Sequence, residues 1–360
     1  MDLDQFKNPK LAKSLLNAIR SYDVGDVNLM EVCGTHTVAI ARSGLRSALP
    51  SGIHLISGPG CPVCVTPNKT IDTIIAFSKM ENVTLATFGD MVRVPGSSTT
   101  LQKQRAEGAS IQVVYSPLDA LQLALENPDR QVVFAGVGFE TTAPLVAATI
   151  KGAKEEDIHN FSVICAHKNV PHVLDALVRD PEVKIDAFIL PGHVSTIIGS
   201  HPYEFLVKEH GIGGVITGFE TVDLLQGIDM LVRQLNDGTP KIEIAYKRGV
   251  RPEGNPTALE LLNEVFEECD DEWRGLGTIP NSGYRIRDEY ADFDAMRRFQ
   301  PDVEPTVEPA GCRCADVLRG KIPPSGCGLF KKTCTPQNPV GPCMVSSEGS
   351  CAAYFKYDIE

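Results

Sequence analysis

The chain has 360 residues, of which 42% are hydrophobic and 22% are charged, a composition typical of a globular protein. This length predicts two or three domains. The formal net charge of −12 argues against a surface that follows nucleic-acid phosphates, so we expect no nucleic acid and look to proteins or small molecules as partners.

The distribution of apolar residues also limits the location of the protein. No apolar run approaches the ~18 residues that a membrane span needs, and the charged start MDLDQFKNPK lacks the apolar core of a signal peptide. We therefore expect a cytoplasmic protein with no membrane partner. In a reducing compartment, eleven cysteines indicate metal binding or redox chemistry rather than a static disulfide framework.

The first two thirds of the chain alternate between strand and helix signals. Segments such as NKTIDTIIAFSK and TVDLLQGIDMLVRQL, with apolar residues three and four apart, separate the strands and predict amphipathic helices. Strands that alternate with helices form parallel sheets covered on both faces, so this region is predicted to be α/β. The predicted strands are Val27–Val32, Ile53–Ser57, Val83–Phe88, Ile111–Tyr115, Gln131–Gly136, Phe161–Ala166, Asp186–Leu190 and Gly214–Thr217.

An internal repeat suggests that this region is two related lobes. AGVGFETTAPL (135–145) recurs as ITGFETVDLL (216–225), each time after an apolar strand and before a helix. We assign residues 1–125 to one parallel-sheet α/β lobe and residues 126–240 to a second.

The remainder, residues 241–360, is expected to form a third domain. A helical signal persists in PTALELLNEVFEE, but Pro, Gly and Cys dominate from Pro301 onward. A segment with so little core needs a metal to hold its shape. We therefore expect a C-terminal, cysteine-rich, metal-binding domain.

Two cysteines in the stretch SGPGCPVCVTP lie at a position typical of functional sites. Cys61 and Cys64 follow the strand Ile53–Ser57 and precede a helix, at the edge where parallel sheets place ligands. The helix N-terminus favours thiolate over thiol. A zinc half-site is the structural alternative, but no second pair with matching spacing lies nearby. We interpret the pair as a redox-active or metal-binding dithiol.

The strand before it leads into CGTHT, which begins at Cys33. Because carboxyl ends of parallel strands share one edge, Cys33 is expected beside Cys61 and Cys64. His36, three residues on, either polarises the Cys33 thiol, donates to a bound anion, or makes an ordinary loop hydrogen bond.

Two further polar loops follow predicted strands. Glu140 of GFETT and His193 of PGHVSTIIG are candidates to line a cleft between the lobes together with Cys33. The alternatives are a first-turn carboxylate that complements a helix dipole for Glu140 and a loop-packing role for His193. Cys165, inside an apolar strand, is assigned to the core, and Cys269 is assigned no role.

Six cysteines occupy the last 50 residues, and they include no C-x-x-C pair. Zinc ribbons use such close pairs, whereas wider spacing suits a cubane cluster held by four thiolates, with zinc as the alternative. The six are Cys312, Cys314, Cys327, Cys334, Cys343 and Cys351.

Taken together, CGTHT, GPGCPVC, GFETT, PGHVSTIIG and CTPQNPVGPCMVSSEGSCAAY resemble the HypD family of hydrogenase maturation proteins, over essentially the whole chain. The resemblance implies two related α/β lobes plus a domain that holds a [4Fe-4S] cluster. It also implies a scaffold on which the Fe(CN)2CO group of [NiFe] hydrogenase is assembled, with a small HypC-type chaperone and a HypE-type cyanide donor as partners.

The resemblance further implies a role for each thiol. Cys33 becomes the principal iron ligand, and Cys61 and Cys64 become a redox pair beside it. For the cluster we select Cys314, Cys327, Cys334 and Cys343, with Cys351 and Cys312 in reserve. Two other functions remain as alternatives: a stand-alone thiol oxidoreductase that depends on an iron–sulfur cluster, and a zinc-stabilised scaffold that binds proteins.

Overall fold

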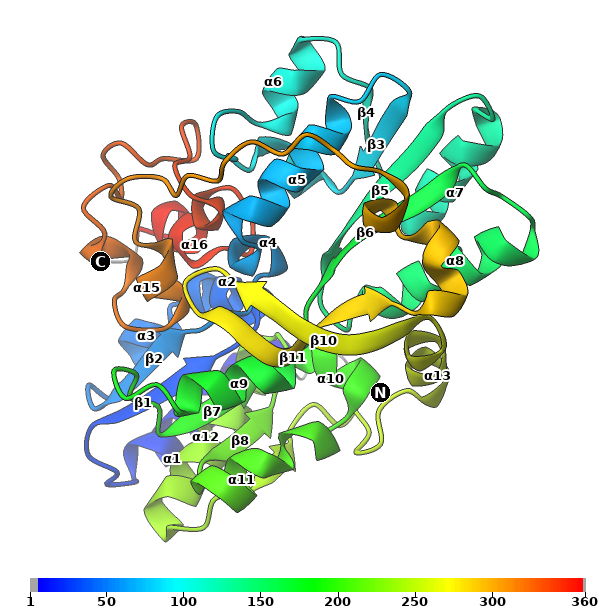
Figure 1. Ribbon diagram of the computed structural model, residues 1–360. Helices are drawn as coiled ribbons and strands as arrows, with labels where there is room; N and C mark the ends of the chain where they lie inside the picture. Colours follow the sequence, from blue (N-terminus) through cyan, green and yellow to red (C-terminus); the bar gives the residue numbers. More distant parts are fainter. Residues whose placement is uncertain (1–5, 359–360) are drawn as a thin grey trace.

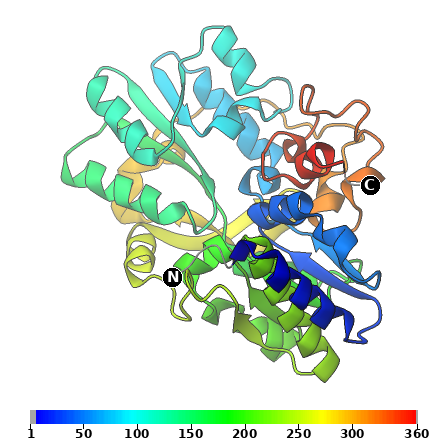
Figure 2. The same cartoon turned by 180° about the vertical axis from the view of Figure 1, so that it is seen from behind.

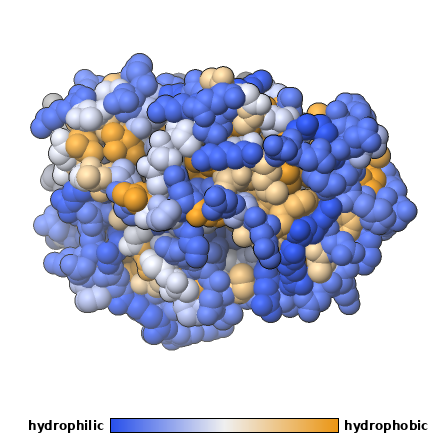
Figure 3. Space-filling model, turned by 45° about the horizontal axis from the view of Figure 1, so that its top comes forward, coloured by the Kyte–Doolittle hydropathy of each residue, from blue (hydrophilic) through white to orange (hydrophobic). Residues whose placement is uncertain are grey.

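The computed structural model describes residues 6–358 and contains two parallel sheets, each flanked by helices (Figure 1). The predicted α/β class is therefore confirmed. Within residues 6–358, no helix combines the length and the apolar character needed to cross a membrane. Figure 3 shows one face of the molecule, on which apolar side chains form a few groups among predominantly hydrophilic ones.

The larger sheet has five parallel strands in the order β2-β1-β7-β8-β9. Its strands are β1 (Val27–Glu31), β2 (Ile53–Ser57), β7 (Ala187–Leu190), β8 (Gly213–Ile216) and β9 (Ile242–Ile244). Helix α1 (Pro9–Arg20) precedes the first of these strands, and the helices that connect strands of this sheet are α2 (Gly34–Ser43), α3 (Leu45–Ala48), α10 (Gly192–Ile198), α11 (Glu204–His210) and α12 (Thr221–Asp237), with the 3-10 helix η3 (His201–Tyr203).

The smaller sheet has four parallel strands in the order β4-β3-β5-β6. Its strands are β3 (Val83–Thr87), β4 (Ile111–Val113), β5 (Gln131–Gly138) and β6 (Phe161–His167). Around them lie α4 (Pro62–Val65), α5 (Asn68–Ser78), η2 (Gly89–Arg93), α6 (Leu101–Ala106), α7 (Pro117–Glu126) and α8 (Ala143–Glu155), whereas α9 (Val170–Val178) lies beside the larger sheet, next to α11 (Figure 1). Nearly every residue of β5 is buried, as expected for a central parallel strand covered on both faces.

The chain passes from one sheet to the other and back. The segment with α4 and α5 leads from β2 in the larger sheet to β3 in the smaller, and α9 leads back from β6 to β7. Each sheet therefore takes strands from both sides of residue 125, and the two sheets do not coincide with the lobes 1–125 and 126–240 that the repeat suggested. The two copies of Gly-Phe-Glu-Thr nevertheless follow strands of different sheets, β5 and β8.

An antiparallel hairpin, β10 (Phe266–Trp273) and β11 (Gly277–Ile286), runs between the two sheets (Figure 1). The helix predicted through PTALELLNEVFEE ends earlier, because α13 covers only Pro256–Val265 and its last three expected residues begin β10. In β10 buried or half-buried residues alternate with exposed acidic ones, the period of a strand rather than of a helix. Cys269, which directly follows the predicted helical segment, lies in this strand.

The end of the chain has short helices and extended loops. After the hairpin come η4 (Asp288–Phe293), α14 (Ala295–Arg298), α15 (Cys314–Leu318), η5 (Pro324–Gly326), η6 (Pro342–Met344) and α16 (Ser350–Lys356). Figures 1 and 2 show the cysteine-rich part to one side of the molecule, next to α2 and α4. Residues 241–360 do not stand apart as one unit, since β9 completes the larger sheet and α13 packs against α8.

Candidate metal and thiol site

Cys33 occupies the junction between β1 and α2. It is the residue that immediately precedes α2, and it is 7% exposed. Burial raises the pKa of Cys33 to about 12, although hydrogen bonds from the backbone N–H groups of His36 and Thr35 oppose that rise. The backbone N–H groups of the first turn of α2 thus stabilise a thiolate at Cys33. A cation bound to the sulfur would replace the stabilisation by water that the thiolate loses on burial.

A buried carboxylate fixes the shape of this junction. Glu31 is fully buried at the end of β1; its Oε2 accepts the backbone N–H of Cys33 at 3.2 Å and its Oε1 accepts the Thr37 hydroxyl. Burial raises the pKa of Glu31 to about 7, against the hydrogen bonds from Thr37 and Ser57. The Glu31 carboxylate therefore fixes the start of α2, because it binds both the residue before the helix and a side chain of its first turn.

The loop that carries Cys61 lies directly against Cys33. The backbone N–H of Gly34 donates to the carbonyl of Gly60 at 2.9 Å, and a Cβ at Gly60 would lie 2.2 Å from the backbone nitrogen of Cys33. Only glycine allows this approach. The convergence of CGTHT and GPGCPVC that the sequence predicted is therefore present in the backbone.

Cys61 and Cys64 are joined by a disulfide, and both are buried. Cys61 immediately precedes the one-turn helix α4 and Cys64 lies within it. Helix α4 contacts α15 and η6, the elements that carry Cys314 and Cys343. One continuous apolar cluster includes this pair and four tail cysteines, namely Cys61, Cys64, Cys314, Cys334, Cys343 and Cys351.

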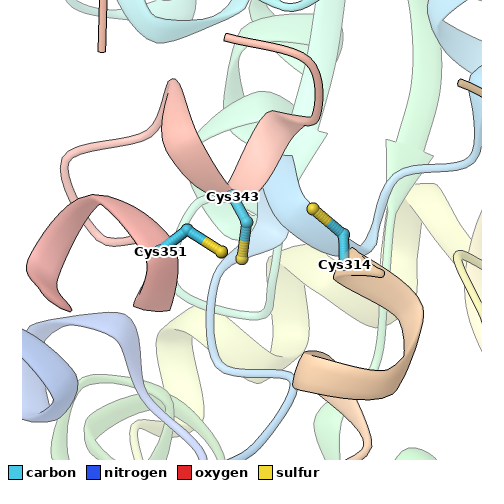
Figure 4. A group of neighbouring side chains, drawn as sticks. All are labelled: Cys314, Cys343 and Cys351. Atoms are coloured by element: carbon cyan, nitrogen blue, oxygen red, sulfur yellow. The ribbon is translucent and has the colours of Figure 1, made fainter. Parts of the chain in front are cut away.

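Three tail cysteines form a compact group. The sulfur atoms of Cys314, Cys343 and Cys351 all lie within 4.8 Å of one another and all three residues are buried. In Figure 4 the side chains of Cys314 and Cys351 point toward Cys343 from opposite sides. Hydrogen bonds from the thiols of Cys314 and Cys351 hold the pKa of Cys343 well below its usual range. Such a group suits a metal or cluster that binds thiolates.

The other tail cysteines adjoin this group. A small apolar pocket is lined by Cys312, Cys314, Cys327, Cys334 and Cys351, and the sulfur of Cys312 lies 3.3 Å from that of Cys314. The structure thus brings all six cysteines together. Of our four selected ligands, Cys314 and Cys343 belong to the compact group, where the third member is Cys351 from the reserve. The donor set fits a thiolate-bound cluster, and the choice of four among six stays a prediction.

Of the three polar candidates, His36 and His193 pack on the same aromatic ring, whereas Glu140 is directed toward α9. The imidazole of His36 is buried and its Nε2 lies 3.0 Å from the carbonyl oxygen of Gly218 and 2.9 Å from the hydroxyl of Thr217. Its side chain therefore makes a loop hydrogen bond. His193 stacks on Phe219 with ring centroids 4.0 Å apart, and His36 packs on the same ring at 4.9 Å.

Glu140 is directed toward α9. Its Oε1 accepts the backbone N–H of Val170 at 2.8 Å, its Oε2 has no hydrogen-bond partner, and burial raises its pKa to about 7. Because its hydrogen-bond partner belongs to α9, a role of Glu140 beside Cys33 stays a prediction. Cys165 lies in β6, as predicted, where its thiol donates to the carbonyl of Tyr284.

Two residues of the site escaped sequence reasoning. The hydroxyl of Thr35 donates to Glu348 at 2.7 Å, which ties the first turn of α2 to the segment between Cys343 and Cys351. Arg274, at the turn of the hairpin, donates to the carbonyl of Thr66 and to Asn68 just after α4. Each is separated from its partner by hundreds of residues, and no spacing rule detects such a pair.

The fold and the site define a class of protein: an α/β protein with two parallel sheets in which a buried thiol, a cysteine pair and a cysteine cluster adjoin one another. A family model described as "HypD: Hydrogenase formation hypA family" matches residues 10–358. The chain belongs to the HypD family of hydrogenase maturation factors.

Individual relatives agree with this assignment. The hydrogenase maturation factor HypD of Rhodobacter capsulatus is 46% identical over 98% of this chain and 97% of its own length. The factor of Azotobacter vinelandii is 45% identical over 99% and 96%, and that of Escherichia coli 43% identical over 99% and 97%. The resemblance inferred from five motifs is thereby confirmed.

Proposed function

We propose that this hydrogenase maturation factor is a scaffold on which the Fe(CN)2CO group of [NiFe] hydrogenase is assembled. In this proposal Cys33 is the protein's ligand to the iron cargo. The main support for the proposal is the contact between Gly60 and Cys33. This contact brings the CGTHT loop and the loop with the cysteine pair together in a single site.

The thiols have distinct tasks in this proposal. Cys33 is held at the start of α2, where backbone N–H groups stabilise its thiolate and Glu31 fixes the loop. The pair Cys61 and Cys64 stores two electrons as a dithiol and releases them when the disulfide forms. The tail cysteines are proposed to hold a [4Fe-4S] cluster, which when bound supplies single electrons.

Contacts around α4 support a connection between the two thiol groups. Helix α4 contacts the elements that carry Cys314 and Cys343. The turn of the hairpin contacts both α15 and the segment after α4: a Cβ at Gly275 would lie 2.3 Å from Cβ of Ala315, and Arg274 donates to the carbonyl of Thr66. We propose a small HypC-type chaperone and a HypE-type cyanide donor as the partners.

Infrared spectroscopy of the chain purified anaerobically with a HypC-type chaperone tests the proposal. Cyanide and carbonyl on iron absorb in a region free of protein bands, so the complex should show them. Cys33→Ala should remove these bands, while the matched control Cys165→Ala, at a thiol in β6 away from the loop, should retain them. If the wild-type complex lacks these bands but its Cys61–Cys64 disulfide can be reduced, the result would instead support a stand-alone thiol oxidoreductase.

A further inference from the structure

The turn of the β10–β11 hairpin places a buried arginine beside the helix that carries the cysteine pair. Arg274 is 6% exposed. Its backbone N–H donates to the carbonyl of Val65 at 2.8 Å. Its guanidinium donates to the carbonyl of Thr66 at 2.7 and 3.0 Å and to Oδ1 of Asn68 at 2.8 Å. Because Val65 is the last residue of α4 and directly follows Cys64, Arg274 binds the C-terminal end of the helix that contains Cys64.

The residues on both sides of Arg274 fix the turn that carries it. Trp273, directly before it, is fully buried and donates its indole N–H to the hydroxyl of Ser282 at 2.8 Å. Gly275, directly after it, packs on α15, where a Cβ on this glycine would lie 2.3 Å from Cβ of Ala315. The position of the guanidinium is therefore set by the hairpin as well as by its own hydrogen bonds.

The positive charge of Arg274 is poorly neutralised. The carbonyl of Thr66 and the amide of Asn68 are uncharged acceptors. Oε2 of Glu308 lies 3.2 Å from Nη1 of Arg274, but the Glu308 side chain is 64% exposed, so water screens this pair. Within residues 6–358, Arg274 forms a salt bridge with no other carboxylate. A buried cation without a buried counter-charge is costly, and a negative charge that forms nearby offsets part of that cost.

Reduction of the cysteine pair creates such a negative charge. Cys61 and Cys64 form an uncharged disulfide, and both are buried. Sγ of Cys61 accepts the backbone N–H of Cys64 at 3.2 Å, a hydrogen bond that strengthens when the sulfur is a thiolate. Helix α4 has four residues, so its two ends are only about 6 Å apart. Since the protein interior screens charge less than water does, the Arg274 cation at one end of α4 stabilises a thiolate at the other.

We propose that Arg274 raises the reduction potential of the Cys61–Cys64 pair, because its charge favours the reduced pair over the disulfide. The inference rests on the redox role of this pair in the function proposed above. Reduction by a dithiol breaks the bond between the two sulfur atoms and moves two electrons to the pair. One sulfur takes up a proton and the other remains a thiolate, while the second proton goes to water and the dithiol closes to a disulfide. Arg274 acts on this equilibrium through α4, so it is a positioning residue.

The midpoint of the pair in dithiothreitol redox buffers tests the proposal. The full-length chain, purified anaerobically, is equilibrated at neutral pH with reduced and oxidised dithiothreitol, quenched with acid and alkylated. Mass spectrometry then quantifies the peptide that contains Cys61 and Cys64. Arg274→Met should make reduction at least about tenfold less favourable, which lowers the midpoint of a two-electron couple by ~30 mV. Arg274→Lys keeps the charge, so its midpoint should lie closer to that of the wild type than to that of Arg274→Met.

The controls separate the charge of Arg274 from its structural contacts. Arg285→Met removes an exposed charge from the same hairpin, where Arg285 pairs with Glu267, and should leave the midpoint unchanged. Arg274→Gln keeps an amide donor and replaces Arg274→Met if that variant does not fold. A wild-type midpoint in the uncharged variant, or a midpoint in Arg274→Lys as low as in Arg274→Met, would overturn the proposal, because a structural role alone does not depend on charge. A wild-type pair that does not titrate as one couple would refute its redox role in the proposed function and this inference with it.

Discussion

Gly60→Ala tests the contact that joins the two loops of the thiol site. The added Cβ would lie 2.2 Å from the nitrogen and 2.4 Å from the Cα of Cys33, whereas ordinary contact begins at 3.4 Å. Both neighbours are backbone atoms, so the loops must separate by roughly 1 Å, and overpacking of this kind costs ~1–3 kcal/mol. Loss of the hydrogen bond from Gly34 to Gly60 adds about 1 kcal/mol.

The consequence is local opening around Cys33. The lower end of this sum, about 2 kcal/mol, corresponds to roughly a 30-fold larger open fraction, so Cys33, which is 7% exposed, should react with iodoacetamide at least about tenfold faster in the variant. Peptide mass spectrometry measures that rate. Gly152→Ala is the matched control, since a Cβ there meets nothing within 4 Å and favours helix α8. If Gly60→Ala alkylates at the wild-type rate with an unchanged urea midpoint, the reasoning is wrong.

Three other predictions concern separate parts of the chain. Cys61 and Cys64 should titrate as one two-electron couple in thiol-trapping experiments under defined redox buffers; independent alkylation of the two thiols at every potential would refute this. Cys343→Ala should abolish an iron chromophore near ~400 nm and make the tail protease-sensitive while far-ultraviolet circular dichroism stays near native. The control Cys165→Ala should keep the chromophore. A full chromophore in Cys343→Ala would remove Cys343 from the ligand set. The pKa of Glu140 is about 7 in the folded chain and 4.5 in the unfolded chain, so between these values the folded chain keeps the proton that the unfolded chain loses. The free energy of unfolding therefore falls as pH rises through this range, by up to ~3 kcal/mol. Glu140→Gln should raise the urea midpoint at pH 8 and not at pH 5, and an equal difference at both pH values would contradict this.

Strands and helices with a regular apolar pattern were predictable from the sequence. Each of the eight predicted strands corresponds to a strand in the two sheets, because buried parallel strands are continuous apolar runs. The β10–β11 hairpin was missed, since acidic residues on its exposed face concealed the alternation and the preceding helical period appeared to continue. Strand order was also missed, because local pattern does not specify which strands pair.

The candidate site was predictable only where a motif carried it. Cys33 and Cys61 are found at the ends of adjacent strands, β1 and β2, and that adjacency follows from a general property of parallel sheets. The hydrogen bond of His36 to Gly218 and the bond of Thr35 to Glu348 depend on which loops meet in space. Local spacing contains no information about such pairs, so sequence reasoning left His36 with several roles and Glu348 with none.

The passage of the chain between its sheets has a consequence for biosynthesis. The smaller sheet, β3 to β6, is complete once residue 167 has left the ribosome, because its four strands are continuous in sequence. The larger sheet begins with β1 and β2 but lacks the neighbour of β1 on its other side until β7 is made. Since domains fold during synthesis in the order in which their parts emerge, β1 and the Cys33 loop stay unpaired on that edge while the smaller sheet forms. Cys33 is thus translated before the smaller sheet but is enclosed only after that sheet is complete.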